Sequence, residues 1–225
     1  MPEVAQEAPA LPLSVPPSAR LLARPSNIAR SVFHFGSGVV ALGLIELLPT
    51  RTWLSIAAAT FVVAAWSMEI ARRGRPEVNA RLMRFFGPVA HPEERHRVNS
   101  STWYVTALLL LALFSPMRAA ELGVVVLAVA DPAAGFIGRR FGRTQLRAGR
   151  SLEGTLAFVV VGALVAAAWL VLSSGMHGST ALILALAAAS SGAIAELAST
   201  RLDDNFTIPI AAAVSVAGAQ ALLAL

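Results

Sequence analysis

The stretch VVVLAVADPAAGFIGRRFGRTQLRAGRSLEGTLAFVVV, residues 124–161, decides how the chain is interpreted. Two apolar runs flank a segment in which Asp131 is followed by glycines, five arginines and Glu153. In lipid the backbone must satisfy its own hydrogen bonds, so apolar runs of about 20 residues cross a membrane as helices. The stretch therefore predicts two spanning helices, with a carboxylate near the end of the first and a basic loop between them.

The composition extends this interpretation to the whole chain. Of the 225 residues, 56% are hydrophobic and only 14% are charged, whereas a soluble domain carries about 25% charge. The prediction is an all-α, polytopic integral membrane bundle of about seven helices. The apolar segments run roughly over 32–49, 52–70, 101–117, 119–138, 152–173, 179–198 and 206–224.

The N-terminal segment, residues 1–27, differs from the rest. It holds six of the thirteen prolines and few large apolar residues, which is typical of a disordered tail. It lacks a charged stretch followed by an apolar core, so we do not expect a signal peptide. The membrane-embedded domain is then expected to cover 28–225.

The basic residues narrow the chemistry. All eighteen cationic side chains are arginine, and neither lysine nor cysteine occurs. The absence of lysine excludes a P-loop lysine, the strand lysine of protein kinases and a lysine Schiff base. The absence of cysteine excludes disulfides and thiolate metal sites. The arginines lie beside apolar segments, which favours the inner leaflet of a membrane over nucleic acid as their partner.

The arginines also predict the orientation. With the N-terminus inside, sixteen of them fall in inner segments, and only Arg51 and Arg118 fall outside. This asymmetry places the N-terminus in the cytoplasm, and the small size and alanine-rich spans suggest a bacterial inner membrane. The long inner loop 71–100 is expected to contain an interfacial amphipathic helix. Its apolar face would carry Val78, Leu82, Phe85, Phe86 and Val89.

Carboxylates sort to the same inner side. Charged groups in or near a bilayer are costly and usually face the interior of the bundle. Their position predicts a polar chamber open to the cytosol. The eight residues are Glu69, Glu93, Glu94, Asp131, Glu153, Glu196, Asp203 and Asp204.

Three motifs in or near these carboxylates point to phosphate chemistry, and each also has a purely structural explanation. Asp131 is either a ligand of a hard cation such as Mg²⁺, or a base, or one half of a structural ion pair. Gly135, Gly138 and Gly142 suit either close helix packing or close approach of the backbone to phosphates. Ser151 can cap the next helix and bring phosphate to its N-terminus, with Glu153 holding a metal ion, or the turn is a simple cap.

At this point the residues resemble a family. ADPAAGFIGRRFGR and GRSLEGTLAF resemble the two halves of the signature of polyprenol kinases, a group that includes dolichol kinase, phytol kinase and CTP-dependent diacylglycerol kinase. RSVFHFGSG, HPEERHRVNSSTWYV and ELASTRLDDNFTIPI resemble further elements of that family in the same order, so the resemblance covers about 28–225. It implies transfer of the γ-phosphate of a nucleoside triphosphate, typically CTP, to a lipid alcohol.

The resemblance and the charge pattern together assign expected roles. The expected catalytic residues are Asp131, Glu196, Arg30 and His34, with Asp131 and Glu196 competing for the role of base. The expected nucleotide-binding residues are Gly138, Arg139, Arg140, Gly142, Arg143, Arg150, Ser151 and Gly154. The expected ligands of Mg²⁺ are Asp131, Glu153, Asp204 and Asn205.

Some positions depart from the family pattern, and other functions stay open. Ala130 stands where the family has glycine, and Ser31 and Arg150 stand where it has lysine. One alternative is a CDP-alcohol synthase of the cytidylyltransferase type, which uses CTP in the membrane. Another is a non-enzymatic membrane transporter, since buried acids also line ion pathways. The residues specify neither the alcohol's tail nor the oligomeric state.

Overall fold

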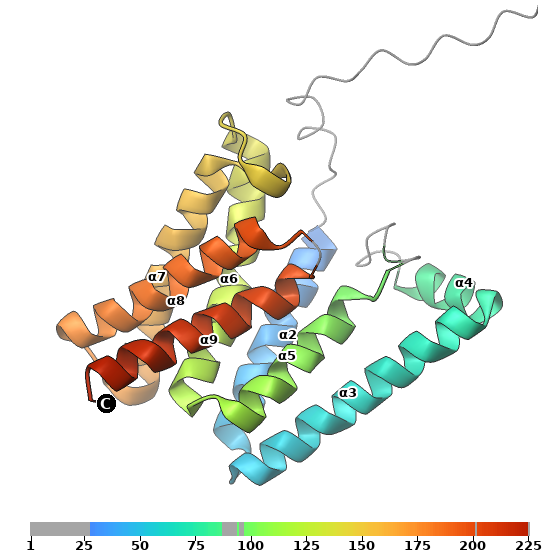
Figure 1. The fold of residues 1–225 in the computed structure, drawn as a ribbon, viewed down its shortest axis with the longest axis horizontal. Helices are drawn as coiled ribbons and strands as arrows, with labels where there is room; N and C mark the ends of the chain where they lie inside the picture. The colour runs from blue at the N-terminus through green and yellow to red at the C-terminus, as the bar shows by residue number, and fades with distance from the viewer. Residues whose placement is uncertain (1–27, 87–93, 95–96, 201, 225) are drawn as a thin grey trace, which may run out of the picture.

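The computed structural model describes residues 28–86, 94, 97–200 and 202–224 (Figure 1). The predicted disordered tail, 1–27, lies outside these ranges, as do Glu93 and Val89. The described residues form eight α-helices, one short 3₁₀ turn and no named strand. The α-helices are α2 (Ile28–Leu47), α3 (Arg51–Gly74), α4 (Pro76–Phe85), α5 (Ser100–Phe114), α6 (Met117–Phe141), α7 (Leu152–Ser174), α8 (Gly178–Ala198) and α9 (Asp204–Leu222).

This arrangement confirms the predicted all-α membrane bundle. Six helices are long and apolar enough to cross a membrane, and α5 is a shorter apolar helix of 15 residues. Each of the seven predicted apolar segments overlaps one of these helices. Their ends differ from the prediction because apolarity marks only the part that is buried in lipid. Thus α3 and α6 continue into polar residues, to Gly74 and Phe141, while α5 ends at Phe114, just before Pro116.

Helix α6 is the centre of the bundle. It contacts α2, α5, α7, α8 and α9, and its spanning part is the most buried of the six. Small residues let its neighbours approach closely, as is usual between membrane helices. A Cβ atom at Gly123 would lie 2.5 Å from the carbonyl oxygen of Pro209 in α9, and one at Gly38 of α2 would lie 2.3 Å from the Cβ of Ala128.

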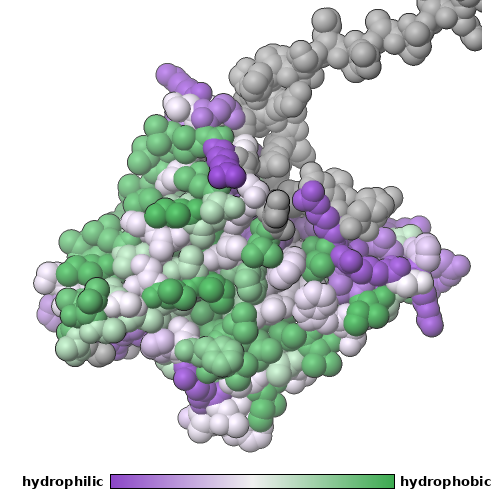
Figure 2. All heavy atoms as spheres, in the orientation of Figure 1, coloured by the Kyte–Doolittle hydropathy of each residue, from purple (hydrophilic) through white to green (hydrophobic). Residues whose placement is uncertain are grey.

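The surface separates apolar from polar regions. In Figure 2 the hydrophilic residues gather at the upper and right-hand edges, around α4 and beside the α6–α7 loop, while much of the remaining face is hydrophobic. Many large apolar side chains are exposed on the outside of the bundle, including Phe61 and Leu164. Such a surface suits lipid as its surroundings. The amphipathic helix expected in the 71–100 loop is present as α4.

Candidate functional site

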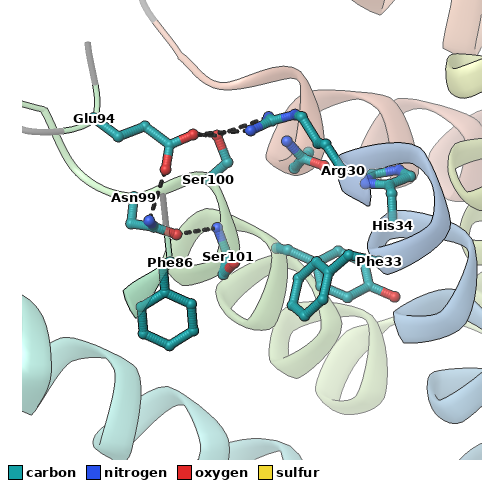
Figure 3. Close-up of a pocket in the computed structure, with 10 residues that line it drawn as sticks. Arg30, Phe33, His34, Phe86, Glu94, Asn99, Ser100 and Ser101 are labelled. Carbon is teal, nitrogen blue, oxygen red and sulfur yellow. Dashed lines mark hydrogen bonds and ion pairs between the residues drawn. The ribbon is translucent and has the colours of Figure 1, made fainter. Parts of the chain in front are cut away.

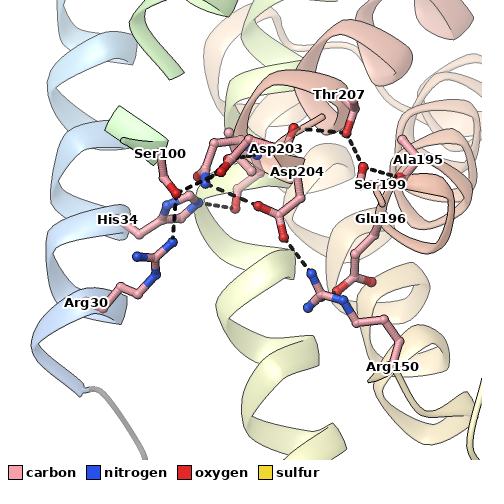
Figure 4. Close-up of polar contacts among 12 residues, drawn as sticks. Arg30, His34, Ser100, Arg150, Ala195, Glu196, Ser199, Asp203, Asp204 and Thr207 are labelled. Carbon is pink, nitrogen blue, oxygen red and sulfur yellow. Dashed lines mark hydrogen bonds and ion pairs between the residues drawn. The ribbon is translucent and has the colours of Figure 1, made fainter. Parts of the chain in front are cut away.

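One end of the bundle brings together polar side chains from five parts of the chain (Figure 4). The start of α2 supplies Arg30 and His34, and α6 supplies Asp131. The loop before α7 supplies Arg150, and the end of α8 supplies Glu196. The start of α9 supplies the run Asp203, Asp204 and Asn205. We call these eight residues the polar cluster.

Arg150 joins two helices at the middle of the polar cluster. Its Nη1 atom lies 2.9 Å from Oε1 of Glu196, and its Nη2 atom lies 2.5 Å from Oδ2 of Asp204. Glu196 is only 2% exposed. Burial alone would lower the pKa of Arg150, but the carboxylates of Glu196, Asp131 and Asp204 outweigh it and raise that pKa above its usual value. The guanidinium is therefore a permanent cation between carboxylates.

Asp131 adds a third carboxylate to this group. The charged groups that interact with it are Asp204, His34, Arg150 and Arg30. It precedes Pro132, which has no N–H and so interrupts the hydrogen bonds of α6. In the same turn, His34 donates from Nε2 to the carbonyl oxygen of Leu127 at 3.1 Å. The side chain of His34 in α2 thus reaches the backbone of α6 one turn before Asp131.

The start of α9 is held by its own acidic residues. The carboxylate of Asp203 caps the helix, accepting hydrogen bonds from the backbone N–H of Asn205 at 3.0 Å and from its side-chain amide at 2.7 Å. Ser100 of α5 also donates to Asp203, at 2.8 Å. Burial, and then the neighbouring charge of Asp204, raise the pKa of Asp203 above its ordinary value. Asn205 is buried and donates to Asp204 as well.

A second group of contacts extends the polar cluster toward α5. Glu94 accepts hydrogen bonds from Arg30 at 3.0 Å and Asn99 at 2.6 Å, and its Oε1 atom lies 3.2 Å from Oγ of Ser100. A pocket of about 40 Å³ opens beside these residues, between the starts of α2, α5 and α9 (Figure 3). Its lining includes Arg30, Phe33, His34, Phe86, Glu94, Asn99, Ser100, Ser101, Tyr104 and Asn205.

The α6–α7 loop is a tight turn. The backbone N–H of Leu146 donates to the carbonyl of Arg150, and that of Leu152 donates to Thr144. Ser151 caps α7 by accepting from Gly154 N–H at 3.1 Å, as predicted. Glu153 lies in the first turn of α7, but its carboxylate accepts from the backbone N–H of Thr144, at 3.2 Å and 3.3 Å. It closes the turn and makes no described contact with Asp131, Glu196 or Asp204.

Three of the predicted glycines, Gly138, Gly142 and Gly154, lie where α6 meets the start of α7. A Cβ atom at Gly154 would lie 3.2 Å from the Cα atom of Gly138 and 3.0 Å from the carbonyl of Ala134. A Cβ atom at Gly142 would lie 2.7 Å from Oγ of Ser151. Close helix packing is therefore enough to explain these glycines. The basic side chains nearby differ in exposure: Arg139 is half-buried, whereas Arg140 and Arg143 are exposed.

The eight inner carboxylates do not share one chamber. Glu69 belongs to a separate network at the end of α3, where its oxygens pair with Arg72 at 2.8 Å and Arg73 at 2.6 Å. Arg72 also donates to the carbonyl oxygens of Glu94 and Arg97. This network ties α3 to the segment before α5. In the part of the chain that the structure describes, no three acidic or histidine side chains lie close enough to hold a metal ion alone.

Sequence reasoning missed part of this site. Asn99, Ser100 and Tyr104 lie in HPEERHRVNSSTWYV, which resembled a family element without a role for these three residues. Glu94, in the same stretch, was predicted only as one carboxylate of the polar chamber. Their signal was the density of polar residues directly before an apolar helix. Only the structure brings them beside Arg30.

Comparison with known proteins gives a distant match. Over 139 residues, which are 60% of this chain, the sequence is 27% identical to CTP-dependent diacylglycerol kinase 1 of Saccharomyces cerevisiae. The matched part is 48% of that protein, so the chain spans about half the length of the curated relative it matches. No family model and no solved structure matches the chain. The similarity supports a relationship to lipid kinases, without indicating a particular member.

Proposed function

We propose that this protein is a membrane kinase that transfers the γ-phosphate of a nucleoside triphosphate, CTP in the first place, to the hydroxyl of an isoprenoid alcohol or diacylglycerol. The observation that carries the proposal is the placing of Arg150 between Glu196 and Asp204, beside Asp131, at one end of an apolar bundle. The distant match to a CTP-dependent diacylglycerol kinase supports the same class of reaction.

The polar cluster suits phosphoryl transfer because this reaction depends mainly on positioning and on neutralising charge. Arginine binds phosphate oxygens in pairs, so Arg150 is the first candidate to hold the triphosphate. The exposed Arg140 and Arg143, with Arg139, stand at the end of α6 where they can extend that contact. The negative charge of a nucleotide would draw Arg150 away from its carboxylates and leave these free for a cation.

The carboxylates fit a magnesium ion. Mg²⁺ takes oxygen ligands, usually one or two carboxylates together with phosphate oxygens and waters. Asp131 and Asp204, with the amide oxygen of Asn205, would supply such ligands, and the ion would offset the charge of the transferring group. Glu153 is a weaker candidate because its carboxylate already accepts from Thr144.

The remaining residues position the acceptor. Arg30 and His34 lie in the first two turns of α2 and line the polar pocket. Both also interact with the charge of Asp131. They can therefore orient a lipid hydroxyl that enters the pocket. In the reaction the hydroxyl oxygen bonds to the γ-phosphorus, the bond from that phosphorus to the β–γ bridging oxygen breaks, and the nucleoside diphosphate leaves. The hydroxyl proton passes to a carboxylate, Asp131 or Glu196.

We also propose that the polar cluster faces the cytoplasm of a bacterial cell. Arg51 begins α3 and Arg118 lies in the first turn of α6, both at helix ends away from the polar cluster. The other arginines of the described residues then lie on the inner side, as the positive-inside rule requires.

The test uses CTP labelled either at the α- or at the γ-phosphate. Purified protein is incubated with Mg²⁺ and, in turn, phytol, farnesol, a longer polyprenol and diacylglycerol, and lipid products are extracted. Label from the γ-phosphate in the lipid, with CDP released, is the expected result. Label from the α-phosphate with pyrophosphate released would identify a cytidylyltransferase instead. No transfer to any of these alcohols from CTP or ATP would overturn the proposal.

A further inference from the structure

Beside the polar cluster, a second cavity lies between α2 on one side and α3 and α5 on the other. Its volume is about 50 Å³, and every side chain that lines it is apolar. Helix α2 packs mainly on α6, while α3 packs mainly on α5. The two helix pairs thus leave a groove whose floor is α6, through Val124. Ala41, Ile45, Ala58, Phe61 and Leu108 are among its walls.

The groove and the polar pocket lie along the same two helices. On α5, Tyr104 lines the pocket and Leu108 lines the groove, one helical turn further on. On α2, His34 lines the pocket and Ala41 the groove, two turns further on. From Arg30 to Ile45 the helix rises roughly 22 Å, against a hydrocarbon core of about 30 Å. The two cavities thus follow one another along a path over α2 and α5, with polar lining at one end and apolar lining at the other.

We infer that this groove holds the hydrocarbon chain of the acceptor lipid, with its hydroxyl in the polar pocket near His34 and Arg30. The inference rests on the proposed function. An amphiphile with one polar end matches the change from charged to apolar lining along the path. Phe61 is 55% exposed on a surface that faces lipid, so the groove opens sideways to the bilayer and a chain can enter without leaving it.

The geometry also indicates which chains fit. The cavity in the groove measures only about 50 Å³, which leaves room for part of one hydrocarbon chain, so the second chain of a diacylglycerol would stay in the bilayer. A chain must pass Tyr104 before it reaches the apolar walls. Narrowing the groove beyond this point should therefore hinder long-chain alcohols and leave short ones unaffected.

The variant that tests this is Ala58→Phe, which adds a ring to one wall of the groove. Ala58 is half-buried, so the helix α3 can accept the larger side chain. The matched control is Ala64→Phe, on the same helix at an exposed position that lines neither cavity. We expect Ala58→Phe to raise KM for phytol by about tenfold, as one badly fitting group does in an apolar site. KM for CTP and for a short alcohol such as isopentenol should not change, and the control should match the wild type.

Photolabelling of the wild-type protein gives a readout that does not depend on activity. The probe is hexadecanol with a diazirine at the tail end, and labelled peptides are located by mass spectrometry. Labels on the groove-lining residues of α2, α3 and α5 that are lost in the presence of excess phytol are the expected result. Labels spread over α7 to α9, or labels that phytol does not displace, would overturn the inference even if Ala58→Phe failed to fold.

The two failures can be told apart. If an alcohol is phosphorylated but the probe labels other helices, the groove assignment is wrong and the proposed function stands. If the probe labels the groove and phytol displaces it, but no alcohol is phosphorylated, the groove binds alcohols and the proposed function is wrong.

Discussion

Removal of the Arg150 side chain should destabilise the protein as well as inactivate it. In Arg150→Ala, Glu196 stays buried, at 2% exposed, and loses the cation 2.9 Å away. Breaking a buried ion pair by deleting one partner costs about 3–5 kcal/mol. Arg150 is itself 25% exposed, and solvent screening therefore places the loss at the lower end of that range, at about 3 kcal/mol.

Two further variants separate the charge from the geometry. In Arg150→Lys the charge is kept, but a single ammonium does not span both carboxylates as the guanidinium does. We expect it to lose about half as much stability as Arg150→Ala. In the double variant Arg150→Ala with Glu196→Gln, the buried group is neutral, so part of the loss should be recovered. The coupling between the two changes should be about 1–3 kcal/mol.

The assay is reversible unfolding of the purified protein in detergent, followed by circular dichroism, with CTP-dependent transfer measured on the same samples. If Arg150→Ala cost less than about 1 kcal/mol, in the range of an exposed pair, the ion pair would not hold α8 and α9 to the α6–α7 loop. Lack of recovery in the double variant would refute the role given to Glu196.

Three other outcomes follow from the same contacts. Gly38→Ala should lower the free energy of unfolding by about 1–3 kcal/mol, because the new Cβ atom would lie 2.3 Å from the Cβ of Ala128. In the control Gly36→Ala the new Cβ atom has no neighbour within 4 Å, so the free energy of unfolding should stay the same or rise by up to about 1 kcal/mol. Equal losses of stability in the two variants would disprove the α2–α6 contact. Glu153→Gln should keep transfer within about tenfold of the wild type, whereas Glu196→Gln should lose more than about 100-fold; the reverse order would make Glu153 the metal ligand. Removal of Mg²⁺ with EDTA should stop transfer, and added Mg²⁺ should restore it; full activity in EDTA would exclude the ion.

The sequence was sufficient to predict the spanning helices but not the residues at which they end. Long apolar runs predict spanning helices because no other open structure satisfies the backbone in lipid. Hydrophobic pattern could not place the end of α6 at Phe141, since the helix continues past the apolar run into arginines. The capping role of Ser151 followed from local chemistry alone, and the structure confirms it.

The partners within the polar cluster could not be predicted from the sequence. Arg150 and Glu153 are three residues apart and looked like parts of one site. In the structure Arg150 lies in extended backbone before the cap of α7 and reaches Glu196 and Asp204. Glu153 follows the cap and turns back to Thr144 instead. Contacts of this kind depend on how α7, α8 and α9 pack, which no local pattern contains.

The transfer rate of Asp131→Asn tests the central claim most directly, because asparagine keeps the shape of this side chain and removes its charge. The rate of γ-phosphate transfer from CTP to the best lipid alcohol is compared with that of the wild type, with unfolding monitored on both. We predict a loss of at least about 100-fold with the fold retained, since the charge belongs to the site of reaction. A folded Asp131→Asn protein that transfers phosphate at the wild-type rate would contradict the account.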